Sequence, residues 1–96
     1  MNMTDSEYHV LIIYDIIHDK RRAKLAEFLN GYGYRVQKSC FEAIITKKLY
    51  KQILKELPRF YNREEDSIRV YRLNGGCSIT NLGLPCEVFC DRMEIL

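Results

Sequence analysis

The residues most able to do chemistry lie where an apolar run meets a cluster of charges. Residues 8–16 read Tyr-His-Val-Leu-Ile-Ile-Tyr-Asp-Ile, and residues 18–24 read His-Asp-Lys-Arg-Arg-Ala-Lys. The apolar run predicts a buried strand. Its terminal carboxylate, Asp15, is costly to bury unless a cation, hydrogen-bond donors or a metal ion pair with it. An acid at a strand end beside several cations suits the handling of a phosphate backbone, with or without a divalent metal. The alternative is that Asp15 caps the following turn or pairs with a nearby arginine.

The positive charge of the chain is concentrated in its middle. The formal net charge is only +2, but residues 20–63 carry twelve Lys and Arg residues against three acids, a balance of +9, with aromatic residues interleaved. Such a basic block favours a polyanionic partner. For Lys47, Lys48, Lys51 and Lys55 the simpler alternative is that they solvate the outer face of a helix.

Length and composition predict a single domain over residues 1–96. A chain of 96 residues, 47% hydrophobic and 29% charged, has an ordinary globular composition but buries a modest core, which oligomerisation commonly enlarges. No apolar run is long enough to cross a bilayer, and residues 1–7 do not resemble a signal peptide, so we expect a cytoplasmic protein without membrane association. The spacing of the cysteines, Cys40, Cys77, Cys86 and Cys90, is atypical of zinc sites and favours reduced thiols.

The elements that must position these residues follow from hydrophobic periodicity. Apolar residues recur at helical spacing in two segments, which have Asp19 and Thr46 as candidate N-caps. Val36 and the apolar residues after Ser39 fall on opposite parities, so a bend or bulge near Lys38-Ser39 is expected to switch the inward face. The expected elements are a strand at 8–16, a helix from Asp19 that ends at Gly31 and Gly33, an extended segment at 34–46, a helix at 47–57 stopped by Pro58, a polar loop at 59–65, a strand at 66–73, a turn at 74–76, a segment at 77–80 compatible with a short strand, and a last strand at 86–93.

This order of elements predicts an α+β protein. Two helices packed on one face of a mostly antiparallel sheet give a ferredoxin-like β-α-β-β-α-β sandwich. The segment 86–93 has no obvious interior place in such a sheet. Its backbone groups can add to the sheet edge of a second copy, so we expect an extra C-terminal strand that is used in dimerisation.

Four segments resemble a known family in type and in order. They are Tyr14-Asp15-Ile16 at the end of the first strand, Lys20-Arg21-Arg22 at the start of the first helix, Tyr-Gly-Tyr-Arg-Val-Gln-Lys-Ser-Cys-Phe-Glu at residues 32–42, and Asp-Ser-Ile-Arg-Val-Tyr at residues 66–71. Together they make the chain similar, from Tyr8 to Leu73, to the small CRISPR-associated adaptation protein, the Cas-two family. The stretch 74–85 is longer and richer in glycine than the family pattern.

The resemblance implies a ferredoxin-like homodimer that works with the CRISPR integrase during spacer acquisition and binds duplex DNA. It also implies a metal-dependent endonuclease that acts on RNA, including single-stranded RNA, or on double-stranded DNA. In this reaction Asp15 of each subunit holds Mg²⁺ or Mn²⁺ at the dimer interface. The positions where the family places further active-site residues are Tyr14, Arg22, Arg35 and Phe41. The basic residues expected to contact nucleic acid are Lys20, Arg21, Arg22, Lys24, Arg35 and Lys38. Lys24 stands where the family often has arginine, and lysine lacks the bidentate fork.

Two functions of different kinds are compatible with the sequence. One is a metal-dependent phosphodiesterase with Asp15 as ligand, although the only other candidate acid and base nearby are Asp19 and His18. The other is a non-catalytic adaptor, whose dimer bridges integrase subunits and holds a duplex on the basic block. Nuclease activity and spacer acquisition measured with Asp15→Asn would separate them. A ferredoxin-like regulatory domain unrelated to CRISPR is a third alternative, and it leaves the four ordered segments unexplained.

Overall fold

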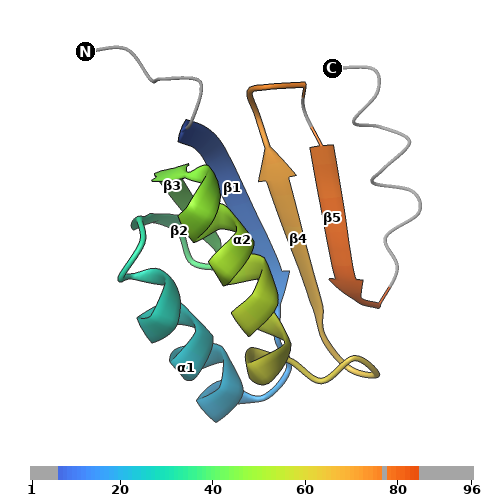
Figure 1. The fold of residues 1–96 in the computed structure, drawn as a ribbon. Helices are drawn as coiled ribbons and strands as arrows, with labels where there is room; N and C mark the ends of the chain where they lie inside the picture. The colour runs from blue at the N-terminus through green and yellow to red at the C-terminus, as the bar shows by residue number, and fades with distance from the viewer. Residues whose placement is uncertain (1–6, 77, 85–96) are drawn as a thin grey trace.

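A single antiparallel sheet with two helices makes up the part of the chain that the computed structural model describes, residues 7–76 and 78–84. The elements, shown in Figure 1, are β1 (Glu7–Asp15), α1 (Asp19–Leu29), β2 (Tyr34–Gln37), β3 (Cys40–Thr46), α2 (Lys47–Glu56), the short 3₁₀ helix η1 (Leu57–Phe60), β4 (Ser67–Arg72) and β5 (Ser78–Gly83). The strand order is β2-β3-β1-β4-β5, and every neighbouring pair is antiparallel. The first four strands and the two helices form the predicted ferredoxin-like sandwich. Neither helix is long and apolar enough to cross a membrane.

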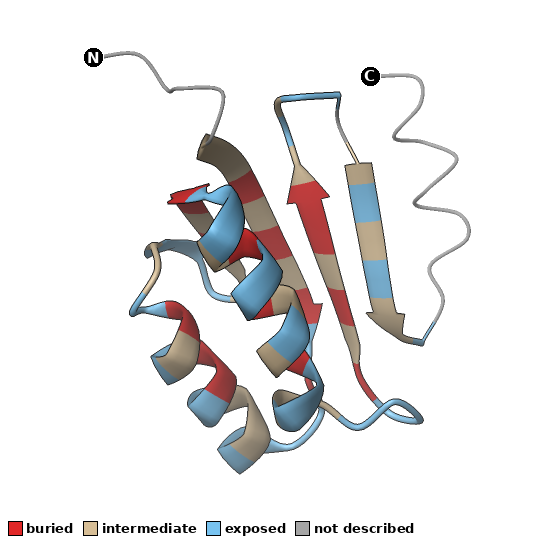
Figure 2. Cartoon of the chain, in the orientation of Figure 1, coloured by how far each residue is buried: buried red, intermediate tan, exposed pale blue. Residues whose placement is uncertain are grey.

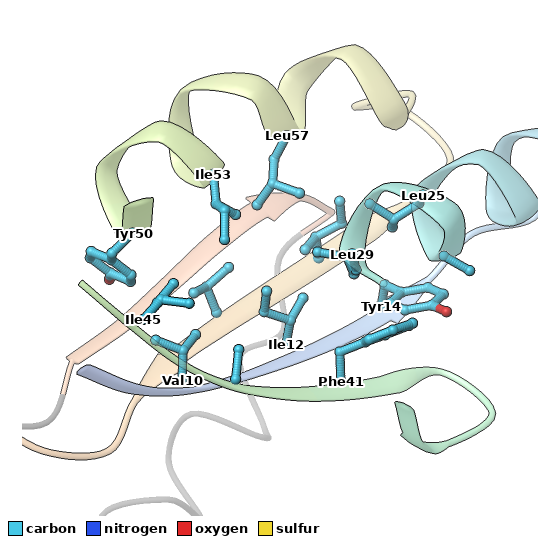
Figure 3. Close-up of a cluster of buried hydrophobic side chains, with 14 of the residues drawn as sticks. Val10, Ile12, Tyr14, Leu25, Leu29, Phe41, Ile45, Tyr50, Ile53 and Leu57 are labelled. Atoms are coloured by element: carbon cyan, nitrogen blue, oxygen red, sulfur yellow. The ribbon is translucent and has the colours of Figure 1, made fainter. Parts of the chain in front are cut away.

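The hydrophobic core lies between the sheet and the two helices, which cover the same face of it. Alternate residues of β1, Val10, Ile12 and Tyr14, are buried, as expected for a strand with a side-chain period of two. Figure 3 shows Tyr50 and Ile53 pointing from α2 toward the sheet. The buried residues that complete this cluster include Leu25, Leu29, Phe41, Ala43, Ile45, Leu57, Ile68 and Val70. The core therefore fixes which residues of each strand face the helices.

The two helices begin in different ways. Thr46 caps α2 as predicted, because its hydroxyl oxygen accepts a hydrogen bond from the Leu49 N–H at 3.2 Å. The prediction of Asp19 as the cap of α1 is wrong by one residue. The N-cap is His18, which makes no side-chain capping bond, and Asp19 is the first helical residue. An acid in the first turn interacts favourably with the helix dipole, so Asp19 still stabilises this end of α1.

The prediction that Gly33 ends the first helix is wrong. α1 ends at Leu29, and neither Gly31 nor Gly33 adopts a positive φ. A Cβ atom at Gly33 would lie 2.3 Å from the Glu42 carbonyl oxygen and 2.7 Å from the Ala43 Cβ. Glycine is needed here because the chain entering β2 passes directly against β3.

The extended segment predicted at 34–46 is a hairpin of β2 and β3. The chain turns at Lys38-Ser39, where a bend was predicted, and the strand register shifts earlier, between Arg35 and Gln37. Val36 was expected to face inward, but it is exposed. All four residues of β2 are exposed, because β2 is the edge strand of the sheet.

The extra strand in the described chain is β5, which is longer than the segment predicted at 77–80. It pairs with β4 along its length, from Ser67 opposite Gly83 to Arg72 opposite Ser78. Gly75 in the preceding turn has a φ of 65°, in the region that favours glycine. The last strand predicted at 86–93 lies outside the described residues.

The second face of the sheet, which we call the helix-free face, carries the alternate side chains of the strands. Neither α1 nor α2 lies on it (Figure 1). Strand alternation and cross-strand register assign to it His9, Leu11, Ile13, Asp15, Tyr34, Ile44 and Ile79. Three of these, Tyr34, Ile44 and Ile79, are large, apolar or aromatic, and exposed. This face therefore has exposed apolar surface that neither helix covers.

Asp66 is the fully buried acid of the described chain, and its carboxylate joins three segments. One oxygen accepts hydrogen bonds from the Ile17 N–H at 2.9 Å, and the other from the Asn62 N–H at 2.8 Å. The Arg21 Nε donates to the second oxygen at 2.8 Å, and Arg21 also contacts the exposed Glu65. Burial alone would raise the pKa of Asp66, but the two N–H donors and the Arg21 guanidinium outweigh it and hold that pKa below its ordinary value.

Replacing Asp66 with asparagine should destabilise the fold. The amide would present N–H groups to the N–H donors of Asn62 and Arg21, and breaking a buried, hydrogen-bonded ion pair costs about 3 kcal/mol. Because the folded-state pKa is lowered, the stabilisation is present above the unfolded pKa of about 3.9 and is lost as the pH falls through the folded value. Urea unfolding at pH 7 and pH 3 should show a smaller difference for Asp66→Asn than for the wild type.

The control for this experiment is Glu65→Gln, which removes an exposed partner of the same arginine. An exposed ion pair contributes at most about 1 kcal/mol, so this variant should stay close to the wild type. If Asp66→Asn unfolded at the same urea concentration as the wild type at pH 7, the hydrogen bonds of Asp66 to the three segments would not stabilise the fold as described.

Candidate nucleic-acid and metal site

Asp15 is the last residue of β1, and it lies opposite Ser67 of β4. It is exposed, so the expectation of a buried carboxylate in need of a partner is not met at this position. The acid that fits that description is Asp66, which was predicted to start a strand and one of the four family segments but not to be a buried, paired carboxylate. Among residues 7–76 and 78–84 no group of three or more His, Cys, Asp or Glu side chains is placed to hold a metal. In one copy of the chain Asp15 is therefore an accessible carboxylate outside any such group.

Tyr14 precedes Asp15 but points to the opposite side of the strand, into the core. Its ring stacks on Phe41 with centroids 6.2 Å apart, and Figure 3 shows the two rings side by side near α1. Its hydroxyl donates a hydrogen bond to the Lys38 carbonyl oxygen at 3.4 Å. Burial raises the pKa of Tyr14, and the neighbouring Arg35 and Arg22 guanidinium groups oppose that shift. Tyr14 is therefore a neutral hydrogen-bonding group that sits among cations.

A basic pocket of about 240 Å³ opens beside Tyr14, between α1 and the β2–β3 hairpin. We call it the helix-side pocket, and its lining residues are Tyr14, Asp19, Arg22, Ala23, Ala26, Arg35 and Lys38. Two guanidinium groups and an ammonium group against a single acid favour an anion of the size of a phosphate.

Two arginines of this pocket are held in place by the fold. Arg22 donates to the Ile16 carbonyl oxygen at 2.8 Å and pairs with the Asp19 carboxylate. The Arg35 Cζ lies 5.6 Å from the centroid of the Phe41 ring, which is within cation–π range. The Phe41 ring that contacts Arg35 also stacks on Tyr14, so Phe41 helps to position both side chains.

The five residues predicted as catalytic do not form one cluster. Tyr14, Arg22 and Arg35 line the helix-side pocket and Phe41 supports it. Asp15 lies on the helix-free face, because neighbouring residues of a strand point to opposite sides of the sheet. The groups suited to hold a phosphate and the acid suited to hold a cation are thus separated by the thickness of β1.

The six residues predicted to contact nucleic acid also differ in their surroundings. Lys20, Lys24, Arg35 and Lys38 are exposed. Arg21 is engaged with Asp66 and Glu65, so its charge is neutralised within the fold. The sequence offered one signal for this pairing, the acidic run at residues 64–66 just before a strand, but the partner lies 45 positions earlier in the chain.

Comparison with known proteins shows which proteins this chain is similar to. The sequence model of the family described as CRISPR associated protein Cas2 matches residues 8–79. A Synechocystis protein named CRISPR-associated endoribonuclease Cas2 3 is 48% identical over 65 residues, which cover 68% of this chain and 71% of that protein. A Mycobacterium tuberculosis protein named CRISPR-associated endoribonuclease Cas2 is 42% identical over 80 residues, or 83% and 70% of the two chains.

A solved structure adds the fold to this likeness. The crystal structure of a hypothetical protein from Thermus thermophilus superposes with a TM-score of 0.67 and 32% sequence identity, and the match covers 82% of this chain and 96% of that one. The family match spans β1 to the start of β5 and includes both Asp15 and the helix-side pocket. The resemblance seen in the four sequence segments is confirmed, and the chain belongs to the CRISPR-associated Cas2 family.

Proposed function

We propose that this chain acts as a homodimeric CRISPR adaptation protein that binds duplex DNA with the integrase and cleaves phosphodiester bonds, in RNA or double-stranded DNA, with Mg²⁺ or Mn²⁺ held by Asp15. The observation that carries the proposal is the position of Asp15, an exposed carboxylate at the end of a central strand on the helix-free face. Relatives 42–48% identical to this chain are named endoribonucleases, which supports the nuclease part. Integrase as partner is an expectation from the family.

The donor set decides how a metal could be held. One carboxylate alone is a poor site, but Mg²⁺ keeps several waters and accepts one or two carboxylates together with phosphate oxygens. Two copies of Asp15 related by a two-fold axis would meet that requirement with hard oxygen ligands. When bound, the cation would supply charge neutralisation at the scissile phosphate. Asp15 would hold it, while Arg22, Arg35 and Lys38 hold the nucleic-acid strand on the other side of β1.

The dimer that this site requires is supported by the helix-free face. Ile44 and Ile79 lie on it and are 55% and 41% exposed. Packing two such faces together would bury apolar surface that one copy leaves accessible, and it would bring both Asp15 residues into the same interface. A contribution from residues 86–96, also expected, lies outside the described part of the chain.

The alternative, a catalytically silent adaptor, is favoured by one specific observation. Within the described ranges, Asp15 belongs to no group of three or more His, Cys, Asp or Glu side chains that could hold a metal ion. Binding by the helix-side pocket does not need Asp15, so an adaptor would retain every group that contacts the phosphate backbone.

Cleavage should require Mg²⁺ or Mn²⁺ and should fall to background in Asp15→Asn. The change removes the charge that binds the cation, and it should alter the free energy of unfolding by less than about 0.5 kcal/mol because the side chain is exposed. The measurement is cleavage of labelled RNA and duplex DNA with and without EDTA, alongside spacer acquisition in cells. Asp19→Asn, which changes an acid of the helix-side pocket, serves as the control and should retain cleavage.

Cleavage that persists in EDTA or in purified Asp15→Asn protein would place the metal site elsewhere. A wild type that is inactive with every cation, combined with normal spacer acquisition by Asp15→Asn, would establish the adaptor alternative.

The protein should be a dimer in solution, and Ile44→Glu/Ile79→Glu should make it monomeric. Both side chains are exposed in one copy, so the charges should be tolerated by the fold but not by a buried interface. Light scattering at micromolar concentration measures the mass. The matched control is Ile17→Glu, at a residue 63% exposed that lies in the loop after β1 and off the sheet. A wild type of monomer mass would contradict the proposal.

Duplex DNA binding should be independent of sequence and steeply dependent on salt. Each phosphate contact adds about 0.9 to the slope of log affinity against log salt. Arg35→Gln/Lys38→Gln should reduce that slope by about 2. Fluorescence anisotropy with two unrelated duplexes between 50 and 200 mM salt provides the measurement. An affinity unchanged over this range would rule out an electrostatic mode of binding.

A further inference from the structure

The outer side of α2 carries a row of cations that the predicted binding residues do not include. Lys48, Lys51 and Lys55 of α2 and Arg59 of η1 follow one another at intervals of three or four residues, so they share one helix face. We call them the α2 basic row. All four are exposed, and Figure 2 shows exposed residues along the side of α2 turned away from the sheet. A shallow groove of about 570 Å³ runs along the row, lined also by Gln52 and Glu56.

The three lysines of this row are not neutralised within the described fold, unlike the two arginines of α1. On α1, Arg21 pairs with Asp66 and Arg22 pairs with Asp19. Arg59 of η1 pairs with Glu56 at the end of α2, at 3.2 Å. Lys48, Lys51 and Lys55 form no ion pair with any residue in the ranges 7–76 and 78–84. Three adjacent positive charges are therefore available to an external anion.

The row is also unfavourable for the helix that carries it. Within α2, Lys47 and Lys51, and Lys51 and Lys55, are like-charge pairs four residues apart, which destabilise a helix. The first turn of α2 contains no acid, and its lysines oppose the helix dipole. Solubility alone would be met by interspersed charges of both signs. The arrangement breaks local rules of helix design, as residues with a binding role often do.

The chemistry of the row indicates which anion it fits. Protein–protein interfaces are depleted in lysine and depend on aromatic and apolar anchors. The large hydrophobic side chains that are exposed in the described chain are Ile17, Tyr34, Val36, Ile44, Leu73, Ile79 and Leu84, and none of them lies on α2 or η1. A flexible row of point charges without an apolar centre is instead suited to a run of phosphates.

We propose that the α2 basic row is a second nucleic-acid-binding surface, which binds the phosphate backbone without reading its sequence. From Lys48 to Arg59 the row extends about 16 Å at 1.5 Å per residue, enough to follow several phosphates of one strand. Both helices cover the sheet face opposite to that of Asp15, so the row stays accessible when the helix-free face packs against a second copy. The inference goes beyond the proposed function, because neither Asp15 nor the helix-side pocket takes part in it.

The test compares wild type with Lys48→Gln/Lys51→Gln/Lys55→Gln in anisotropy titrations of a labelled 30-base-pair duplex. Each lysine that contacts a phosphate should contribute about 1 to the salt slope, so the slope should fall by about 3. The dissociation constant at 50 mM salt should rise roughly ten-fold or more. The urea midpoint should stay the same or increase, since the substitutions remove repulsion from the helix.

Three further measurements make the outcome decisive. Lys48→Arg/Lys51→Arg/Lys55→Arg keeps the charge and should keep the wild-type slope. Arg35→Gln/Lys38→Gln, measured in parallel, tests the helix-side pocket separately, so that a failure of the proposed function and a failure of this inference are distinguishable. Binding of poly-L-glutamate tests for an acidic protein in place of nucleic acid.

The proposal is overturned if the glutamine variant has the wild-type affinity and slope, or if the arginine variant loses as much binding as the glutamine variant. It is also overturned if the glutamine variant loses poly-L-glutamate binding while its duplex binding is intact, because the row would then recognise acidic protein.

Discussion

The buried carboxylate of Asp66 is the interaction on which the geometry of this protein depends. A carboxylate without access to water is tolerated only when hydrogen-bond donors or a cation pair with its oxygens. Here two backbone N–H groups and the Arg21 guanidinium do so. The donors come from the loop after β1, from α1 and from the loop before β4. A single side chain thereby fixes where α1 starts relative to the sheet, and the place of Arg22 and of the helix-side pocket follows from it.

The same interaction explains why adjacent arginines have different surroundings. Arg21 faces Asp66 and Glu65, and its charge holds the fold together. Arg22, one residue later, is turned by about 100° around the helix, and it donates to the Ile16 carbonyl at the mouth of the pocket. Helical geometry thus gives the two neighbouring arginines different roles. Arg21 stabilises the fold, and Arg22 lines the helix-side pocket.

The sequence predicted those features that depend on local pattern. Neighbouring residues alone determine the alternation of buried side chains in β1, the Thr46 cap and the position of the turn at Lys38-Ser39. The family resemblance also rests on short segments of neighbouring residues. The role of Asp66 was not predicted and that of Gly33 was predicted wrongly, because both depend on distant segments: Asp66 on an arginine 45 residues earlier, and Gly33 on the backbone of β3. For the candidate site, the residue types were predicted, but their division between the two sides of β1 was not. The side-chain period of two in a strand already implies that division. The one-residue error at Asp19 is of the size usual for helix ends.

The alternation of Tyr14 and Asp15 along β1 has a consequence for how members of such a family can diverge. Because the proposed function assigns binding of a nucleic-acid strand and its cleavage to opposite sides of one β-strand, natural selection could act on each without disturbing the other. A lineage in which cleavage brings no advantage can lose the acid by a single codon change and keep its hold on nucleic acid. A lineage under pressure for a different substrate can reshape the pocket while the acid stays in place. The pleat of a strand would thus make the two proposed activities separable traits.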